Sequence, residues 1–234
     1  MNVYEKILFN FSSRSHASSI RINESTIWVT GGLGGSGTLS STEILHAGST
    51  FKEGTELPEP MAYHCSAQIN STHLVLAGNV YGDHMQAYIV DTSRNPFTFT
   101  KLPNMLKPRW GCACTIIHQP TTIHHDDGFY ENGVQIMVGG GDFPFYSSTD
   151  VYSFESGSWE EGPKLPRGFY LGGYTQNSYT DDFILIGGWD GSSYPTNLLK
   201  YNQYENNFDV LDTSLSIGRS RFGTIIVDKD DYCS

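Results

Sequence analysis

Four arginines are candidates for binding acidic groups. Each stands at the start of a segment rich in small residues. They are Arg14, Arg109, Arg167 and Arg221. A guanidinium can hold a carboxylate through two parallel hydrogen bonds, so a set of such side chains at one rim could bind an acidic peptide motif. The alternative is that each arginine caps nearby loop carbonyls. A further segment of this kind carries Ala62 in place of an arginine.

Aromatic side chains in polar, turn-rich loops form a second candidate binding surface. Exposed aromatic groups are enriched at protein interfaces, where they provide most of the contact area. Alternatively, they pack against a neighbouring part of the fold. The candidates are Tyr81, Trp110, Phe143, Phe145, Tyr146, Trp189 and Tyr194.

Catalytic and metal-binding patterns have little support in the sequence. His124-His125-Asp126-Asp127 contains metal-ligand residue types, but four adjacent loop residues cannot all turn toward one ion. We interpret this segment, within the insertion from His118 to Gly133, as a solvated loop. No nucleophile elbow, phosphate-binding loop or His-Glu-x-x-His helix occurs. We expect no enzyme activity, no metal and no cofactor.

The elements that would position these residues are short strands in a repeated pattern. A glycine-containing turn is followed 13 or 14 residues later by an apolar strand residue, and a large aromatic residue follows that one by 7 positions in all four copies. The strand residues and aromatics are Ile44 and Phe51, Val90 and Phe97, Tyr152 and Trp159, and Tyr201 and Phe208. Leu-Pro follows in three copies, and the fourth has only Leu211 or Leu215. The first glycine-turn positions are separated by 46, 62 and 48 residues, a period typical of radially repeated β-sheets.

As a set, these motifs resemble the kelch repeat, in which an apolar strand ends in Gly-Gly and is followed by an aromatic residue and Leu-Pro. The resemblance implies an all-β fold, a kelch-type β-propeller with four recognisable blades. We expect a single domain, 1–234, with blades at about 14–58, 62–103, 109–166 and 167–215. Partial-blade strands are expected at 4–11 and 219–228, so the ring would be incomplete. This favours a fragment of a longer protein; the alternative is a complete chain whose terminal strands pair.

Each predicted blade also has an innermost strand with many small residues, which suits strands that converge around a propeller axis. In kelch domains, the loops between the second and third strands and those between successive blades form the partner-binding face. The resemblance therefore implies that the arginines ring one mouth of the channel. The predicted innermost strands run from Arg14 to Arg21, Tyr63 to Ile69, Arg109 to Ile117, Arg167 to Tyr174 and Arg221 to Val227.

Charge and cysteine content limit the partners and the location. The net charge of −11 argues against nucleic acid and anionic membranes, because both select clustered Lys and Arg. Cys65, Cys112, Cys114 and Cys233 show no framework spacing, so we expect reduced, buried side chains and a cytoplasmic location. Asn-x-Ser/Thr tripeptides occur at Asn10, Asn23 and Asn70, a number that chance alone would produce.

The predicted function is a protein-protein interaction module that binds a peptide or protein at the channel mouth. Among proteins it resembles, such propellers recruit substrates to cullin-based ubiquitin ligases or bind actin. The alternatives are a propeller enzyme of copper-oxidase type and a secreted kelch ectodomain.

Overall fold

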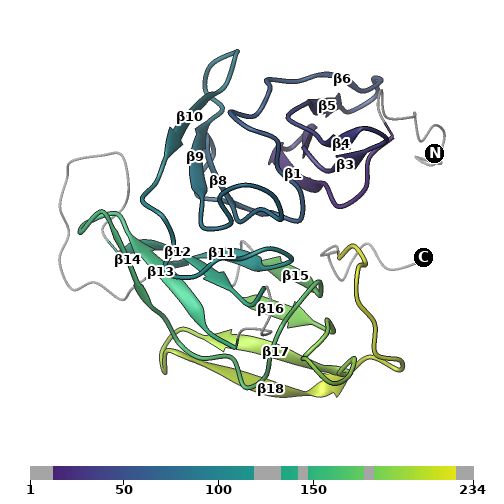
Figure 1. Ribbon diagram of the computed structural model, residues 1–234. Helices are drawn as coiled ribbons and strands as arrows, with labels where there is room; N and C mark the ends of the chain where they lie inside the picture. The colour runs from purple at the N-terminus through teal and green to yellow at the C-terminus, as the bar shows by residue number, and fades with distance from the viewer. Residues whose placement is uncertain (1–12, 119–132, 142–146, 177–181, 225–234) are drawn as a thin grey trace. The chain divides into compact units, whose positions relative to one another are not determined.

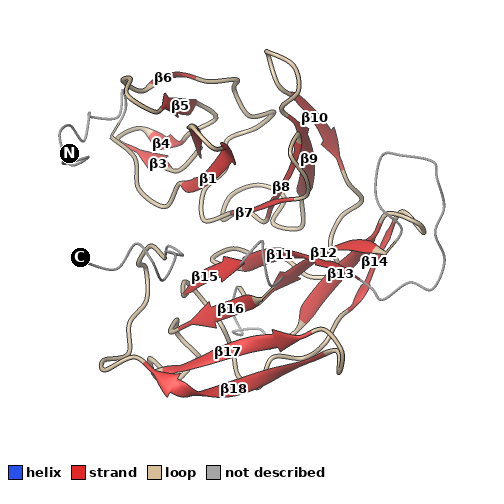
Figure 2. Cartoon of the chain, turned by 180° about the vertical axis from the view of Figure 1, so that it is seen from behind, coloured by secondary structure: helices blue, strands red, loops and turns tan. Residues whose placement is uncertain are grey.

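The structure, a computed structural model, describes residues 13–118, 133–141, 147–176 and 182–224. These residues form strands, turns and loops without a helix (Figure 1; Figure 2). The fold is all-β and of β-propeller class, with four blades that are each a four-stranded antiparallel sheet. The chain divides into two compact units, Met1–Asn104 and Met105–Ser234, and each unit contains two blades.

Unit 1 holds the first two blades, and within each the strands pair in chain order. A small hairpin, β3 (Leu33–Gly34) and β4 (Gly37–Thr38), lies between the second and third strands of the first blade. The first blade comprises β1 (Ser18–Asn23), β2 (Thr26–Thr30), β5 (Thr42–His46) and β6 (Lys52–Glu53). The second comprises β7 (Cys65–Gln68), β8 (His73–Ala77), β9 (Ala87–Asp91) and β10 (Thr98–Lys101).

Unit 2 repeats this arrangement twice. The third blade comprises β11 (Ala113–His118), β12 (Val134–Gly139), β13 (Thr149–Ser153) and β14 (Ser158–Glu161). The fourth comprises β15 (Gly173–Gln176), β16 (Phe183–Ile186), β17 (Asn197–Asn202) and β18 (Asn207–Ser214). The predicted blade spans contain these strands, whereas the prediction of one domain for the whole chain stays a prediction.

Glycine turns end the second strand of the blades, as the sequence pattern predicts. At Gly140, φ is +72°, and a Cβ there would lie 2.3 Å from the carbonyl oxygen of Phe169. The next amide, of Gly141, donates to that same oxygen at 2.7 Å. Glycine is needed here because the backbone of the following blade's first segment approaches so closely.

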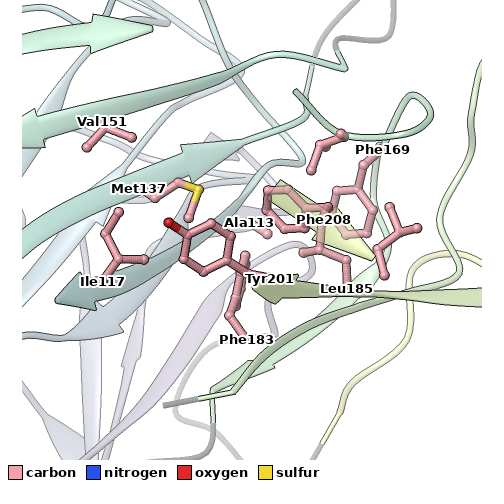
Figure 3. Packing of buried hydrophobic residues seen from close by; sticks show 11 residues of the cluster. Ala113, Ile117, Met137, Val151, Phe169, Phe183, Leu185, Tyr201 and Phe208 are labelled. Carbon is pink, nitrogen blue, oxygen red and sulfur yellow. The ribbon is translucent and has the colours of Figure 1, made fainter. Parts of the chain in front are cut away.

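The core of unit 2 lies between its two sheets (Figure 3). Met137 and Val151 from the third blade belong to one buried cluster with Leu185, Leu199 and Phe208 from the fourth. Unit 1 has an equivalent cluster around Trp28, which is fully buried. Burying such side chains supplies most of the stabilising free energy of a β-fold, at about 25 cal/mol per Å² of apolar surface.

The repeat aromatics and leucines largely occupy the core. Phe208 is buried in the unit 2 cluster, Trp159 is buried against Tyr152, and Phe97 meets Trp28 edge to face at 5.3 Å. The leucines of the Leu-Pro pairs, Leu57, Leu102 and Leu165, are all buried. In the fourth blade Leu215 takes the corresponding place, because its amide donates to Thr196 as that of Leu165 does to Ser147.

The cysteine prediction is wrong for two residues. Cys65 and Cys114 are disulfide-bonded, whereas Cys112 is a free, buried thiol. Reduced cysteines therefore no longer support a cytoplasmic location, which itself stays a prediction.

The described residues include no helix that is long and apolar enough to cross a bilayer. The predicted partial strand at 4–11 and the insertion loop with His124 lie outside the described residues. Of the predicted strand at 219–228, residues 225–228 also lie outside them, and the described residues 219–224 contain no strand.

Candidate partner-binding site

Arg109, one of the arginines predicted to bind a partner, is fully buried in the third blade. Its Nε and Nη2 donate to the two carboxylate oxygens of Asp150, at 3.2 and 2.8 Å. Its Nη1 donates to the carbonyl oxygens of Gly140 and Ser148, at 2.6 and 3.0 Å. Both side chains of the ion pair have 0% exposure, so this guanidinium links strand β13 to the glycine turn rather than facing solvent.

Arg14 makes the same set of contacts in the first blade. Its Nη2 donates to Glu43 at 2.6 Å, and its Nη1 donates to the carbonyl oxygens of Gly31 and Ser41 at 2.7 and 2.9 Å. Both members of the ion pair have 2% side-chain exposure. For Arg14 and Arg109 the structure therefore agrees with the capping alternative, extended by a buried carboxylate.

Strand register identifies the equivalent residues in the other two blades. Arg14 and Arg109 lie four residues before the first residue of β1 and β11, and the residues four before β7 and β15 are Met61 and Phe169. We call this place the inner position. Two residues after the inner position, the backbone has a positive φ in all four blades, at His16, Tyr63, Gly111 and Leu171. Arg221 also has a positive φ, which makes Arg219, two residues before it, the next residue of this series. Arg167 and Arg221 are thus not equivalents of Arg14, although the sequence pattern suggested so.

Arg167 instead lies two residues before the inner position and is half-buried. It donates to the side-chain oxygen of Asn197 at 3.3 Å and to the Asn197 carbonyl at 3.1 Å. Burial lowers its pKa, an effect that nearby Asp190 partly opposes. Arg221 is exposed, and its amide donates to the carbonyl of Leu171 at 2.7 Å.

Four aromatic residues of unit 2 are linked by two ring contacts and one backbone bridge. We call them the aromatic strip: Trp110, Tyr170, Trp189 and Tyr194. Trp110 meets Tyr170 edge to face, with ring centroids 4.8 Å apart. The backbones of Tyr170 and Trp189 form an isolated β-bridge, in which Trp189 donates to Tyr170 at 2.8 Å. Trp189 in turn contacts Tyr194 at 4.7 Å between centroids. The first three rings are half-buried, and Tyr194 is 51% exposed.

The loop between β16 and β17 holds the outer half of the strip in place. Asp190 accepts hydrogen bonds from the amides of Ser192 and Ser193, at 2.8 and 2.7 Å, and from both of their hydroxyls. Burial would raise the pKa of Asp190, but these four bonds outweigh it and lower the pKa to about 2. A negative charge therefore lies in the loop between Trp189 and Tyr194 at neutral pH.

The strip is specific to unit 2. The same backbone pairing joins Ser15 to Leu33 in the first blade and Ala62 to Val80 in the second. These residues take the places of Tyr170 and Trp189 but carry no aromatic ring. The aromatic surface is thus an addition to a repeated backbone arrangement rather than a requirement of the fold.

The remaining predicted site residues divide into two groups. Tyr81 is 55% exposed in the loop between β8 and β9 of unit 1. Phe143, Phe145 and Tyr146 lie outside the described residues. Tyr170 was not among the predicted site residues, although Arg109-Trp110 and Phe169-Tyr170 occupy the same two places in successive copies.

Metal ligands do not gather in the described residues, where no group of three or more His, Cys, Asp or Glu side chains could hold an ion. His64 is buried, and its Nε2 lies 2.7 Å from the Thr30 hydroxyl oxygen. Burial lowers its pKa to about 4, so it is neutral at physiological pH.

No family model matches the chain, and no curated protein matches it. A solved structure described as "Structure of YjhT" is similar, with a TM-score of 0.68 over 88% of this chain and 71% of that chain. The two sequences are 11% identical, so the likeness shows the fold alone. The propeller is therefore established, whereas membership of the kelch family stays a prediction.

Proposed function

We propose that the chain is a protein-interaction module and that the aromatic strip is part of its partner surface. The observation that carries this proposal is the strip itself: two touching ring pairs, each with one tryptophan, whose backbones are joined by a bridge at the loop end of two adjacent blades. Tryptophan and tyrosine dominate the energetics of protein interfaces because they bury large areas with little loss of side-chain entropy.

The chemistry around the strip favours a neutral or basic peptide segment. Asp190 stays ionised beside the rings, and the chain carries a net charge of −11. The guanidinium groups of Arg14 and Arg109, which would favour an acidic motif, are bonded to Glu43 and Asp150. A segment with aromatic or aliphatic side chains and a positive charge would therefore complement this surface.

The finer roles that the kelch resemblance implies, in ubiquitin-ligase recruitment or actin binding, would each use such a surface. The secreted-ectodomain alternative gains support from one observation, the disulfide-bonded Cys65 and Cys114.

The proposal can be tested with a displayed random-peptide library selected on the full chain. Tyr194→Ala and Trp189→Ala should each weaken the selected peptides at least about tenfold, the effect of losing about 1.4 kcal/mol at a hot spot. Tyr204→Ala is the matched control, because Tyr204 is 96% exposed in the same blade, in the turn between β17 and β18.

Peptides that bind the Tyr194→Ala and Tyr204→Ala variants equally well would contradict the proposal, as would a library that yields no binders. Circular dichroism and the midpoint of urea unfolding check that each variant remains folded.

A further inference from the structure

Two of the Asn-x-Ser/Thr tripeptides lie in the same kind of turn, between the first and second strands of the blades of unit 1. Asn23 follows Ile22 at the end of β1, and Asn70 lies between β7 and β8. In the first turn, the side-chain oxygen of Asn23 accepts hydrogen bonds from the amide and the hydroxyl of Ser25, at 3.0 and 3.2 Å. In the second turn, the side-chain oxygen of Asn70 accepts hydrogen bonds from the amide and the hydroxyl of Thr72, at 2.9 and 3.2 Å.

These contacts commit the oxygen of each amide and leave its nitrogen available. The Asn70 oxygen also accepts the amide of His73 at 2.8 Å. Within the described part of the chain, neither Nδ2 donates a hydrogen bond to a protein group. Asn23 is exposed and Asn70 is partly exposed, so a group attached to either nitrogen could extend into solvent.

Asn202 provides an internal contrast. Its side-chain oxygen accepts the amides of Tyr204 and Glu205 in a similar turn, at 3.2 Å each. Its Nδ2, however, donates to Asp209 at 3.1 Å, and the third residue of its tripeptide is Tyr204. A side-chain nitrogen without a hydrogen bond to a described protein group and a Ser or Thr at the third residue occur together at Asn23 and Asn70, and both are absent at Asn202.

A second, independent observation concerns the redox environment. Cys65 and Cys114 are disulfide-bonded, and disulfides form and persist mainly in compartments of the secretory route. Asparagine-linked glycans are added in the same route, to Asn-x-Ser/Thr tripeptides in exposed turns.

We propose that Asn23 and Asn70 are acceptor sites for N-linked glycans. In this reaction Nδ2 bonds to the anomeric carbon of an oligosaccharide carried on a lipid pyrophosphate. The bond from that carbon to the pyrophosphate oxygen breaks, the amide nitrogen loses one proton, and the lipid pyrophosphate leaves. The transfer requires no oxidant or reductant.

A glycan at Asn70 would be attached at the end of β8 away from the Tyr81 loop of the same blade. Strand β8 runs from His73, next to the Asn70 turn, to Ala77, next to the loop that carries Tyr81. The two features therefore lie at opposite ends of one strand. Modification of this turn is thus compatible with partner binding at the loop end of that blade.

The test uses the full chain, expressed behind a cleavable secretory leader in a eukaryotic cell, and intact mass before and after peptide N-glycosidase treatment. We expect glycan mass at both sites. Asn23→Gln and Asn70→Gln should each remove one glycan, Thr72→Ala should remove the glycan at Asn70, and Thr72→Ser should retain it. Asn202→Gln should leave the mass pattern unchanged apart from the substitution itself.

Whole-cell protein is measured together with secreted protein, so that a chain retained by the cell also reports its glycan content. A chain at its bare peptide mass would overturn the proposal. Glycan mass that survives the Asn23→Gln/Asn70→Gln double substitution unchanged would also overturn it, because the glycan would then lie at Asn10.

Discussion

Each unit contains one blade with a buried ion pair and one blade with uncharged side chains at the same two places. In the first and third blades the inner position is arginine, bonded to Glu43 or Asp150 on the third strand. In the second and fourth blades the inner position is Met61 or Phe169, and the register places Tyr88 and Leu199 where the carboxylates stand. The propeller backbone is therefore compatible with either an ion pair or two uncharged side chains at these places.

The difference shows which task the arginines perform. In the ion-paired blades, the arginine also donates to the carbonyl just before the third strand, that of Ser41 or Ser148. In the fourth blade Arg167 donates to the equivalent carbonyl, that of Asn197, from two residues away. A donor to this carbonyl recurs in three blades, while the buried carboxylate is needed only where the inner residue is charged.

The largest effect is expected from removing one partner of a buried ion pair. Asp150→Ala leaves Arg109 charged and fully buried without its carboxylate, and it also removes the acceptor for the amides of Leu106 and Lys107. We expect the free energy of unfolding to fall by about 3–5 kcal/mol. Urea unfolding followed by tryptophan fluorescence measures this change.

Asp182→Ala is the matched control. Asp182 and Lys200 are only 2.7 Å apart, but their side chains are 32% and 37% exposed. Solvent screening should limit the loss there to at most about 1 kcal/mol. Equal losses for the two substitutions would show that burial does not set the strength of these pairs.

The next effect is a pH dependence that originates in the second blade. His64, in the second blade, has a pKa lowered by burial to about 4, below its usual 6.5. Between these values the unfolded chain binds a proton that the folded chain does not, so stability falls as the pH drops from 6.5 to 4. The loss attributable to this group is at most about 3 kcal/mol.

A series of urea titrations across this pH window tests the assignment. The variant His64→Gln should lose the part of the pH dependence that belongs to this residue, although other groups continue to titrate. If the wild-type and variant profiles run parallel, His64 is not the group responsible.

A smaller effect is expected from converting an ion-paired blade into an apolar one. The double substitution Arg109→Phe/Asp150→Leu copies the residue types of the fourth blade into the third. It removes the buried charge together with its partner, so it should recover about 2 kcal/mol of the loss seen for Asp150→Ala. The double variant could instead lose as much free energy of unfolding as Asp150→Ala, or more. That result would show that the hydrogen bonds from Arg109 to the carbonyls of Gly140 and Ser148 contribute more to stability than removal of the buried charge restores.

The repeated backbone could be predicted from the sequence because its signals are local. Glycine turns, Leu-Pro pairs and strand alternation follow from φ angles and from the burial of neighbouring side chains, and four copies reinforced one another. Even so, the predicted glycine turn of the third copy was counted from Gly139, the first residue of the run Gly139-Gly140-Gly141, and this is one residue too early. Gly139 belongs to β12, and Gly140 and Gly141 form the turn.

The site was harder to predict because it depends on register and on contacts remote in sequence. Arg167 was grouped with Arg109 by residue type, although Phe169 holds the equivalent place. The carboxylates had a local signal, since Glu43 and Asp150 each follow the threonine that begins the third strand of the blade. The disulfide-bonded cysteines had none, because the Cα separation that a disulfide requires cannot be derived from sequence spacing.

The smallest effect concerns the polar residues that accompany the apolar inner position of the second blade. The Tyr88 hydroxyl donates to Glu59, and the Gln86 amide, with its nitrogen toward the carboxylate, donates to the same group at 2.6 Å. Burial raises the pKa of Tyr88, and the bond to Glu59 and its negative charge raise it further. Because the phenol holds its proton more tightly when folded, this stabilisation is present below pH 10 and is lost as the pH rises above it.

Tyr88→Phe should therefore lower the free energy of unfolding by about 1 kcal/mol at neutral pH, the net contribution of one hydrogen bond, while Gln86 still pairs with Glu59. The variant should also lose the part of the alkaline pH dependence that belongs to Tyr88, measured as urea unfolding above pH 9. A loss at neutral pH comparable to that of Asp150→Ala would mean that the second blade depends on its polar network as strongly as the third depends on its ion pair. The apolar and ion-paired blades would then differ in residue type but not in energetics.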